Sequence, residues 1–567
     1  MEIKELKISN FRGIKSLDWK INNRIVCLIG PGDSTKSTVL AAISLLFSPR
    51  WNVPITDVDF FDLKVDQTIE INGVITGFPI EFSQDSKFGL YHCFWNEKEL
   101  VHVKEEPNDE LALNIVFRVD KTLEPIWFVK NLDTEQEKSI SASDRERLFV
   151  AELGFYVERD LSWGRYSGLT KVTGRKNTQS SSVALAEITR AARNSFESGR
   201  FVELRNALDG LREVLKGFGV EPKGELTPGL DPREMSINSG LITAHDSGIP
   251  LNVSGLGSRR LVTMAIYRSL AEDGAIFLID EIETGFEPFR LRKLLNNLKE
   301  STTSQSFFTS HSVIPIIELA ENGIFIVRNN AGNITINKLD KELVPFARVM
   351  PEALLSKVII ICEGKTEWGI LRSVNSYWSK NKRELDFGTS GVEPSHHKKI
   401  GGSASHEQAE KLCKSGFITA FFGDSDRDTT PTFDELRQIG VGVFTWPDGL
   451  CTEQRICLDI PFEGLQELIE LAISCGTERV NILQDINSQL KNIDEDMEEI
   501  DDLRTISDTE LIRKILGNAV NSCKSFKEND HGILLGELLV KYLDQMVKKP
   551  TYITLNQLIE WTHEQSS

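Results

Sequence analysis

The sequence predicts an α/β protein built of several domains. Its 567 residues exceed what one hydrophobic core holds, so about two to four domains are expected. Short apolar runs such as 25–29 (IVCLI) and 358–362 (VIIIC) are typical of buried strands in a parallel sheet. Segments with helical spacing of apolar residues follow these runs, as they do when helices cover such a sheet.

Composition narrows the class of protein. Hydrophobic content of 40% and charged content of 26% are ordinary for a globular chain, and no apolar run approaches the roughly 20 residues of a membrane span. The first residues (MEIKE) lack the apolar segment of a signal peptide. The eight cysteines are scattered without a Cys-x-x-Cys pair, which argues against a disulfide framework or a zinc ribbon. We therefore expect a cytoplasmic protein with no membrane partner.

Pattern changes along the chain indicate its organisation. Residues 1–150 alternate as strands do, whereas 183–218 carry apolar residues at helical spacing. That helical segment could pack on a second subunit or form an ordinary core-facing layer, and the sequence leaves both open. Strand–helix alternation returns at 249–345. From about 350 a further unit follows, with strands at 358–362, 418–422 and 441–446, helices near 366–380 and 405–415, and a mainly helical stretch at 462–567.

A phosphate-binding loop is predicted after the first apolar run. The strand 25–29 leads into GPGDSTKST at 30–38, and a helix begins at 39–43, which is the context that a P-loop needs. Backbone N–H groups there would hold the phosphates of ATP, Lys36 would reach the β- and γ-phosphates, and Ser37 would ligate Mg²⁺. The positions assigned to nucleotide binding are Gly30, Gly32, Thr35, Lys36, Ser37 and Thr38. Thr35 stands where the usual pattern has glycine, so ATP hydrolysis is less secure than ATP binding.

Four further motifs accompany this loop. The strand 275–279 ends at Asp280 and Glu281, which would hold Mg²⁺ and position the attacking water. Ser254 and Gly255, in VSGLGS, resemble the signature loop of ABC-type ATPases. His311 follows a strand that includes 307–309, at the place where ABC-type ATPases carry the histidine that senses the γ-phosphate. The opening LKISNFRGI at 6–14 resembles the first strand of ATPases related to structural-maintenance-of-chromosomes proteins, which implies a place for Arg12 near the nucleotide. In this class the signature loop completes a site on a facing head, so the resemblance implies a homodimer.

Acidic residues follow two apolar strands in the unit that starts near residue 350. Glu363 follows 358–362, and Asp424, Asp426 and Asp428 follow 418–423 (ITAFFG). Carboxyl ends of parallel strands gather ligands, and clustered carboxylates need cations, so a Mg²⁺ or Mn²⁺ site is predicted. Glu367 lies one helical turn beyond Glu363, and Glu453 follows the strand near 443–446, so both are further candidate ligands.

The pair formed by Glu363 and the Asp424-x-Asp426 motif resembles the Toprim fold of topoisomerases, primases and some nucleases. An ABC-type ATPase head followed by a Toprim domain resembles the OLD (overcoming lysogenisation defect) family of nucleases. The resemblance covers nearly the whole chain and depends on the order of the motifs. It implies ATPase parts at 1–165 and 246–348, a helical dimerisation insert at 166–245, and a Toprim nuclease domain with a helical extension at 349–567. By position, Lys527 matches a lysine that this family carries late in the Toprim region, where it could stabilise transition-state charge.

The resemblance implies an ATP-controlled, divalent-metal-dependent DNA endonuclease or nickase that serves anti-phage defence. Its catalytic residues would be Glu363, Glu367, Asp424, Asp426, Glu453 and Lys527. The implied partners are DNA and a second copy of the chain, in a homodimer or higher homo-oligomer formed by the ATPase region. A helicase or a retron reverse transcriptase with its RNA–DNA product is a further implied partner, because Gabija nucleases and retron effectors share this layout. The alternative is a nucleotide-dependent scaffold or sensor that binds a partner protein or nucleoprotein, with a structural Toprim domain. Topoisomerase activity is a weaker alternative, because no tyrosine stands in a winged-helix context.

Overall fold

The computed structural model describes most of the chain. It covers residues 1–131, 134, 136–154, 157–163, 167–175, 243–271, 274–380, 387–391, 403–426, 428–476, 478–493, 499–502 and 507–566, with isolated positions between 187 and 228. The chain divides into two compact units, one formed by residues 1–12, 20–25 and 37–309 and the other by 13–19, 26–36 and 310–567. The helical pattern at 183–218, and most of the predicted insert at 166–245, lies outside the described residues.

The first unit combines antiparallel and parallel strands. One antiparallel run has the order β1 (Glu2–Phe11), β4 (Ile69–Thr76), β7 (Glu110–Val119), β5 (Cys93–Trp95) and β6 (Leu100–Val101), with β8 (Ile126–Lys130) and β9 (Glu137–Ser139) beyond β7. A parallel run has the order β10 (Val150–Leu153), β13 (Ile276–Ile279) and β14 (Gln305–Thr309). Its helices include α2 (Asp85–Phe88), α3 (Ala142–Arg147), α4 (Gly168–Arg175), α7 (Leu256–Leu270) and α8 (Pro288–Lys299).

The second unit begins around the phosphate-binding loop. Strand β3 (Ile25–Ile29) pairs in parallel with β15 (Ile324–Asn330), which turns back into β16 (Asn333–Lys338) beside β2 (Ile14–Lys20). Helices α9 (Val313–Leu319) and α10 (Val344–Val349) follow in the chain. Helix α1 (Lys36–Leu46) begins at the end of the loop, and all of its residues after Lys36 belong to the first unit. The predicted strand 25–29 is confirmed with the same bounds.

A separate four-stranded parallel sheet follows in the second unit. Its order is β18 (Phe387–Gly391), β17 (Val358–Cys362), β19 (Ile418–Gly423) and β20 (Gly442–Thr445). All five residues of β17 are fully buried, as expected for a central strand covered on both faces. Register pairs Cys362 with Phe422 and Phe422 with Phe444, so the three strands end at the same edge of the sheet.

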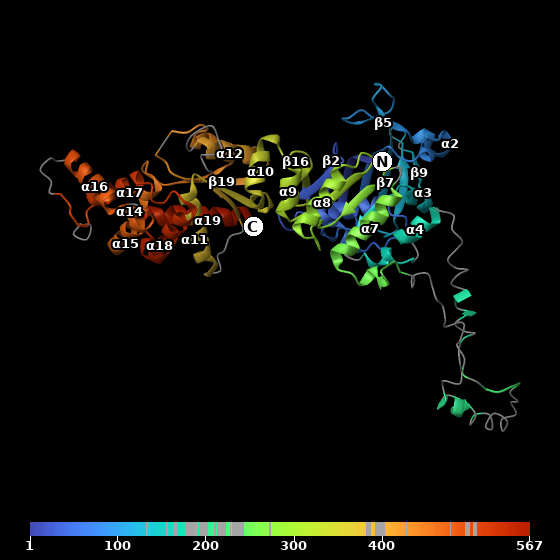
Figure 1. Cartoon of the computed structure of the whole chain (residues 1–567). Coiled ribbons are helices and arrows are strands. Elements are labelled where there is room, and N and C mark those ends of the chain that lie inside the picture. Colours follow the sequence, from blue (N-terminus) through green and yellow to red (C-terminus); the bar gives the residue numbers. More distant parts are fainter. Residues whose placement is uncertain are drawn as a thin grey trace. The chain divides into compact units, whose positions relative to one another are not determined.

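Helices complete the second unit. They are α11 (Lys365–Lys380), α12 (Ser403–Lys414), α13 (Phe433–Gln438), α14 (Thr452–Asp459), α15 (Phe462–Ser474), α16 (Arg479–Ile493), α17 (Glu510–Ser522), α18 (Asn529–Tyr542) and α19 (Pro550–Ser566). Figure 1 shows α14 to α18 gathered together in orange and red, and their apolar faces share one core with β17 and β19. The predicted helical stretch at 462–567 is thereby confirmed over its described residues. In the described part of the chain, no helix has both the length and the apolarity needed to cross a bilayer.

Candidate functional site

The loop between β3 and α1 has the shape of a phosphate cradle. Lys36 is 5% exposed, and its ammonium donates to the carbonyl oxygens of Gly30 (3.0 Å) and Pro31 (2.7 Å) and to Ser34 Oγ (3.0 Å). These acceptors are uncharged, so a phosphate oxygen would bind the ammonium more strongly than they do. A Cβ on Gly30 would lie 2.6 Å from the Val327 carbonyl oxygen, which explains the glycine there. Gly32 is exposed, and Thr38 lies in the first turn of α1.

Thr35 adopts a backbone conformation that suits glycine. Its φ is +66°, where the Cβ of a β-branched residue is crowded by its own backbone. The Thr35 hydroxyl donates to the Ser34 carbonyl oxygen at 2.5 Å, which helps to hold this conformation. A Cβ on Gly13 would lie 2.8 Å from Thr35 Cγ2, so the missing side chain at Gly13 makes room for the threonine methyl group. The departure from the usual P-loop pattern is therefore accommodated locally.

Asp280 connects α1 with the ends of β13 and β14. It accepts hydrogen bonds from Ser37 Oγ (2.9 Å) and Thr309 Oγ1 (2.6 Å), and Ser37 and Asp280 are the pair expected to hold Mg²⁺. Thr309 Oγ1 also accepts from the Glu281 N–H at 2.8 Å, and the Glu281 carboxylate accepts from Thr284 Oγ1 at 3.0 Å. Thr309 was not among the predicted site residues, because a hydroxyl inside a buried strand has no pattern of its own. The strand register, which pairs Ile279 with Phe308, places it beside Asp280.

The loop before α7 is fixed to the Asp280 segment. Ser254 precedes the helix and Gly255 is its exposed N-cap residue. Arg260 is fully buried and donates to the carbonyl oxygens of Asp280 (3.0 Å), Glu281 (3.1 Å) and Thr284 (2.8 Å). A Cβ on Gly257 would overlap the carbonyl oxygen of Gly285, so helix and loop meet at backbone distance.

Arg12 and His311 are the two remaining predicted nucleotide contacts. Arg12 donates to Asp59 Oδ1 at 2.9 Å, with a side chain that is 47% exposed. His311 is exposed just after β14. Their roles toward a nucleotide stay predictions.

The predicted acidic residues meet at the common edge of β17, β19 and β20. Glu363 Oε2 accepts from the Asp424 N–H at 2.8 Å, which joins the ends of β17 and β19. A Cβ on Gly423 would lie 2.6 Å from the Glu363 Cβ, so this glycine allows the approach. Glu367, in the first turn of α11, is 3% exposed and points back to the same edge.

Thr452 holds this centre together. Its hydroxyl lies 2.6 Å from Glu367 Oε1 and 2.8 Å from Asp424 Oδ1, and its N–H donates to the same Asp424 oxygen at 2.8 Å. Trp446 Nε1 donates to the Thr452 hydroxyl oxygen at 2.7 Å. Thr452 was not among the predicted site residues. Its position at the start of α14, next to Glu453, is the signal that could have identified it.

Glu453, the residue after Thr452, forms an ion pair with Lys527. The Glu453 side chain is fully buried, and its Oε1 lies 3.0 Å from Lys527 Nζ. Neither carboxylate oxygen of Glu453 accepts a well-aligned hydrogen bond from the described residues. Lys527 directly precedes α18, and Thr366 Oγ1 of α11 donates to the Phe526 carbonyl oxygen at 2.8 Å. A Cβ on Gly369 would overlap the backbone of Gly532, so α11 and α18 pack closely enough to fix the position of Lys527.

Crowded carboxylates change the proton affinities in this centre. Burial, together with the charges of Glu367, Glu363 and Glu453, raises the pKa of Asp424 to about 9. Burial also raises the pKa of Glu367. Burial alone would lower the pKa of Lys527, but the charges of Glu453 and Glu367 raise it above its ordinary value. Proton binding by Asp424 and Glu367, together with the positive charge of Lys527, therefore offsets the crowding of carboxylates in this centre.

Asp426 and Asp428 are exposed beyond β19. In the described part of the chain, no three His, Cys, Asp or Glu side chains are arranged to hold a metal ion as they stand. Glu363, Glu367 and Asp424 are turned toward protein donors, namely the Asp424 N–H and Thr452. Ligation of a cation would require these side chains to reorient.

Family comparisons identify the first part of the chain. A family model described as AAA ATPase domain matches residues 1–151, and one described as AAA domain, putative AbiEii toxin, Type IV TA system matches 175–315. The chain thus contains ATP-binding ATPase domains of the AAA type. No curated protein matches it.

Solved structures with some likeness come from recombination and chromosome proteins. The recombination mediator RecF with ATP is 13% identical, with 59% of this chain and 99% of that chain covered and a TM-score of 0.32. The SMC head domain from Thermotoga maritima is 14% identical, with 60% and 100% covered and a TM-score of 0.27. An SmcHead bound to the C-winged helix domain of ScpA is 12% identical, with 60% and 99% covered and a TM-score of 0.34.

Proposed function

We propose that this chain is an ATP-controlled, divalent-metal-dependent DNA endonuclease or nickase with a Toprim-like nuclease domain. The observation that supports the proposal is the gathering of Glu363, Glu367, Asp424 and Glu453 with Lys527 at the carboxyl edge of one parallel sheet. Such edges are where ligands bind in open α/β sheets.

The donor set suits Mg²⁺ or Mn²⁺. All of the proposed ligands are carboxylate oxygens, which hard divalent cations prefer. Glu453 is buried with oxygens that lack well-aligned donors among the described residues, and Asp426 and Asp428 are exposed where a cation that also binds a DNA phosphate could reach them. When bound, the cation would activate water and stabilise charge on the phosphate.

The protein groups have distinct proposed roles. Glu363, Asp424 and Asp426 would be the principal ligands, and Glu367, Asp428 and Glu453 would complete the set. Thr452 would hold Glu367 and Asp424 in place until a cation takes over their oxygens. Lys527 would donate to the phosphate as negative charge develops there.

ATP would control the nuclease rather than drive the cut. Ser37, Asp280 and Thr309 form a connected group at the nucleotide-binding end of the ATPase domain. Thr35 carries strain at the loop, which is consistent with a site that binds ATP and turns it over slowly.

Plasmid cleavage tests this function. Purified protein with Mg²⁺ or Mn²⁺ should nick or cut supercoiled DNA, and D424A/D426A should lose nearly all of this activity. D434A, which removes an exposed carboxylate from α13, is the matched control and should cut normally. Equal cleavage by D424A/D426A and D434A would refute the proposed centre.

A role in anti-phage defence is part of this proposal, with a helicase or a retron reverse transcriptase as the class of partner. Cells that produce the wild-type protein with its neighbouring gene products should resist phage better than cells that produce D424A/D426A. Equal plaque counts would contradict the defensive role without touching the nuclease chemistry.

A nucleotide-dependent scaffold is the second candidate function. It is favoured by the inward hydrogen bonds of Glu363, Glu367 and Asp424, which protein donors already satisfy. Under this alternative, ATP would promote assembly with a partner while no divalent metal supports DNA cleavage. Cleavage that depends on Asp424 would exclude it.

A further inference from the structure

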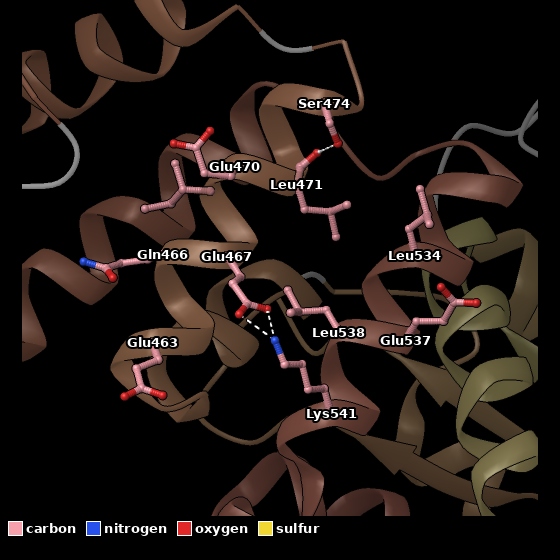
Figure 2. Close-up of a pocket in the computed structure, with 11 residues that line it drawn as sticks. Glu463, Gln466, Glu467, Glu470, Leu471, Ser474, Leu534, Glu537, Leu538 and Lys541 are labelled. Atoms are coloured by element: carbon pink, nitrogen blue, oxygen red, sulfur yellow. Dashed lines mark hydrogen bonds and ion pairs between the residues drawn. The ribbon is translucent and has the colours of Figure 1, made fainter.

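Two helices of the second unit leave a groove that neither the ATPase residues nor the acidic centre uses. It has a volume of about 1100 Å³ and lies between α15 and α18, whose side chains line it (Figure 2). At 1.5 Å per residue, helices of 13 and 14 residues give it a length of about 20 Å.

The groove has apolar side chains among its lining residues. Ile469 and Leu471 come from α15, and Leu534 and Leu538 come from α18. Leu534 exposes 40% of its surface, although the neighbouring Leu535 is fully buried. Covering such a side chain would be favourable, because burial of apolar surface contributes about 25 cal/mol for each Å².

Acidic side chains accompany these apolar ones. Figure 2 shows Lys541 pointing at Glu467, and its ammonium donates to both carboxylate oxygens at 2.6 and 2.7 Å. Glu470 accepts from Arg479 at 2.5 Å. Glu463 and Glu537 also line the groove, and no basic side chain of the described residues pairs with them. The groove therefore keeps negative charge that its own lysine does not neutralise.

We propose that this groove is the docking site for a basic amphipathic helix of a partner protein. An amphipathic helix places its apolar face into a hydrophobic groove, and its length of about three to four turns would match α15 and α18. Lysines or arginines beside that face would pair with Glu463 and Glu537. Nucleic acid is excluded as the occupant, because its phosphates would meet carboxylates of the same sign.

A peptide of defined chemistry tests the groove. The probe is a fluorescein-labelled 14-residue helix of leucine and lysine with leucines at spacings of three and four, and a scrambled peptide of the same composition is its control. The full-length protein should bind the amphipathic probe, and E463K/E537K and L534D should each weaken binding by at least about tenfold. D434K/E510K makes the same charge change at exposed sites outside the groove and should bind normally. Equal binding of the scrambled peptide, or binding by the groove variants within twofold of the wild type, would overturn the proposal.

A photo-crosslinking residue at position 534 identifies the natural occupant in cells. The proposal predicts a crosslinked segment that is basic and amphipathic, and loss of the crosslink in E463K/E537K. A crosslink to a second copy of this chain, or to an acidic segment, would refute it. Plasmid cleavage by E463K/E537K should stay unchanged, so a failure here is distinct from a failure of the nuclease proposal.

Discussion

At the scale of single residues, Thr35 and Gly13 form a matched pair in the phosphate-binding loop. A β-branched residue at φ +66° costs about 1–3 kcal/mol, which exceeds the roughly 0.4–1 kcal/mol that glycine loses through unfolded-state entropy. Thr35→Gly should therefore stabilise the protein by about 1 kcal/mol. Gly13→Ala should destabilise it by about 1–2 kcal/mol, because the new Cβ would lie 2.8 Å from Thr35 Cγ2.

The double variant separates contact from backbone effects. If the methyl contact is the cause, Gly13→Ala should cost almost nothing in the Thr35→Gly background, with a coupling of about 1 kcal/mol or more. Thermal melting of the four proteins in one buffer measures this cycle. Additive effects would show that Gly13 is needed for a reason other than the room it leaves for Thr35.

Thr452 carries the second residue-scale prediction. Thr452→Val keeps the shape but removes the hydroxyl that contacts Glu367, Asp424 and Trp446. Buried polar groups without partners cost about 1–3 kcal/mol each, so the variant should lose roughly 2–3 kcal/mol of stability. Thr452→Ser keeps the hydroxyl and should melt close to the wild type. Equal melting of the valine and serine variants would mean that the hydroxyl does not organise the centre.

The residues that could be predicted from sequence share one property. Glu363 and Asp424 directly follow apolar strands, so strand prediction alone locates them at the sheet edge. Thr309 and Thr452 could not be predicted in this way, because their importance comes from partners that are distant in sequence. Lys527 was assigned by family position alone, and its ion pair with Glu453 supports a place near the centre without testing its role.

At the scale of elements, apolar runs decided which strands could be predicted. Predictions at 358–362 and 418–422 were confirmed because buried parallel strands are continuously apolar. Strand β18 (Phe387–Gly391) was missed because FGTSG has neither an apolar run nor alternation. Its pairing with β17 is a register of the backbone, from Val358 with Phe387 to Cys362 with Gly391.

The packing of α12 on β19 predicts a dependence of stability on pH. His406 of α12 is 1% exposed, and its ring lies 4.3 Å from the Phe421 ring of β19. Burial lowers the pKa of His406 below its ordinary 6.5, although the hydrogen bond with the Pro431 carbonyl oxygen opposes this shift. Below pH 6.5 His406 binds a proton in the unfolded chain, whereas burial opposes its protonation in the folded chain. The stability contributed by neutral His406 is thus complete above pH 6.5 and is lost as pH falls toward the lowered value.

Melting temperatures of the wild type and His406→Gln between pH 7.5 and about pH 5 check this prediction. Across the lower part of that range the wild type should lose up to about 1.4 kcal/mol for each pH unit more than the variant. Carboxylates that titrate in both proteins cancel in the difference. Parallel pH profiles would show that His406 does not resist protonation in the folded state.

At the scale of the whole molecule, the nucleotide-binding residues come from segments that are far apart in sequence. Ser37, Asp280 and Thr309 are joined by strand register and hydrogen bonds, which motif spacing alone could not show. The order of the motifs did predict an ATPase in the first part of the chain, and family models of ATPase domains match residues 1–151 and 175–315. The domain boundaries proposed near 165, 245 and 348 stay predictions.

The exposed loop before α7 leads to a prediction about assembly. Gly255, the N-cap of this 15-residue helix, is exposed, and a Cβ there would meet no atom within 4 Å, so a ligand can reach the chain at this residue. Helix N-termini bind phosphate through free N–H groups and the helix dipole.

If a second copy brings its ATP to this loop, slowing hydrolysis with Glu281→Gln should make the protein dimeric in ATP and Mg²⁺. Ser254→Arg in that background should restore the monomer by blocking the loop, whereas Ser507→Arg adds the same charge at an exposed serine outside it and should leave the dimer intact. Light scattering after size exclusion measures these masses, and a Glu281→Gln protein with the same mass with and without ATP would contradict assembly through the loop.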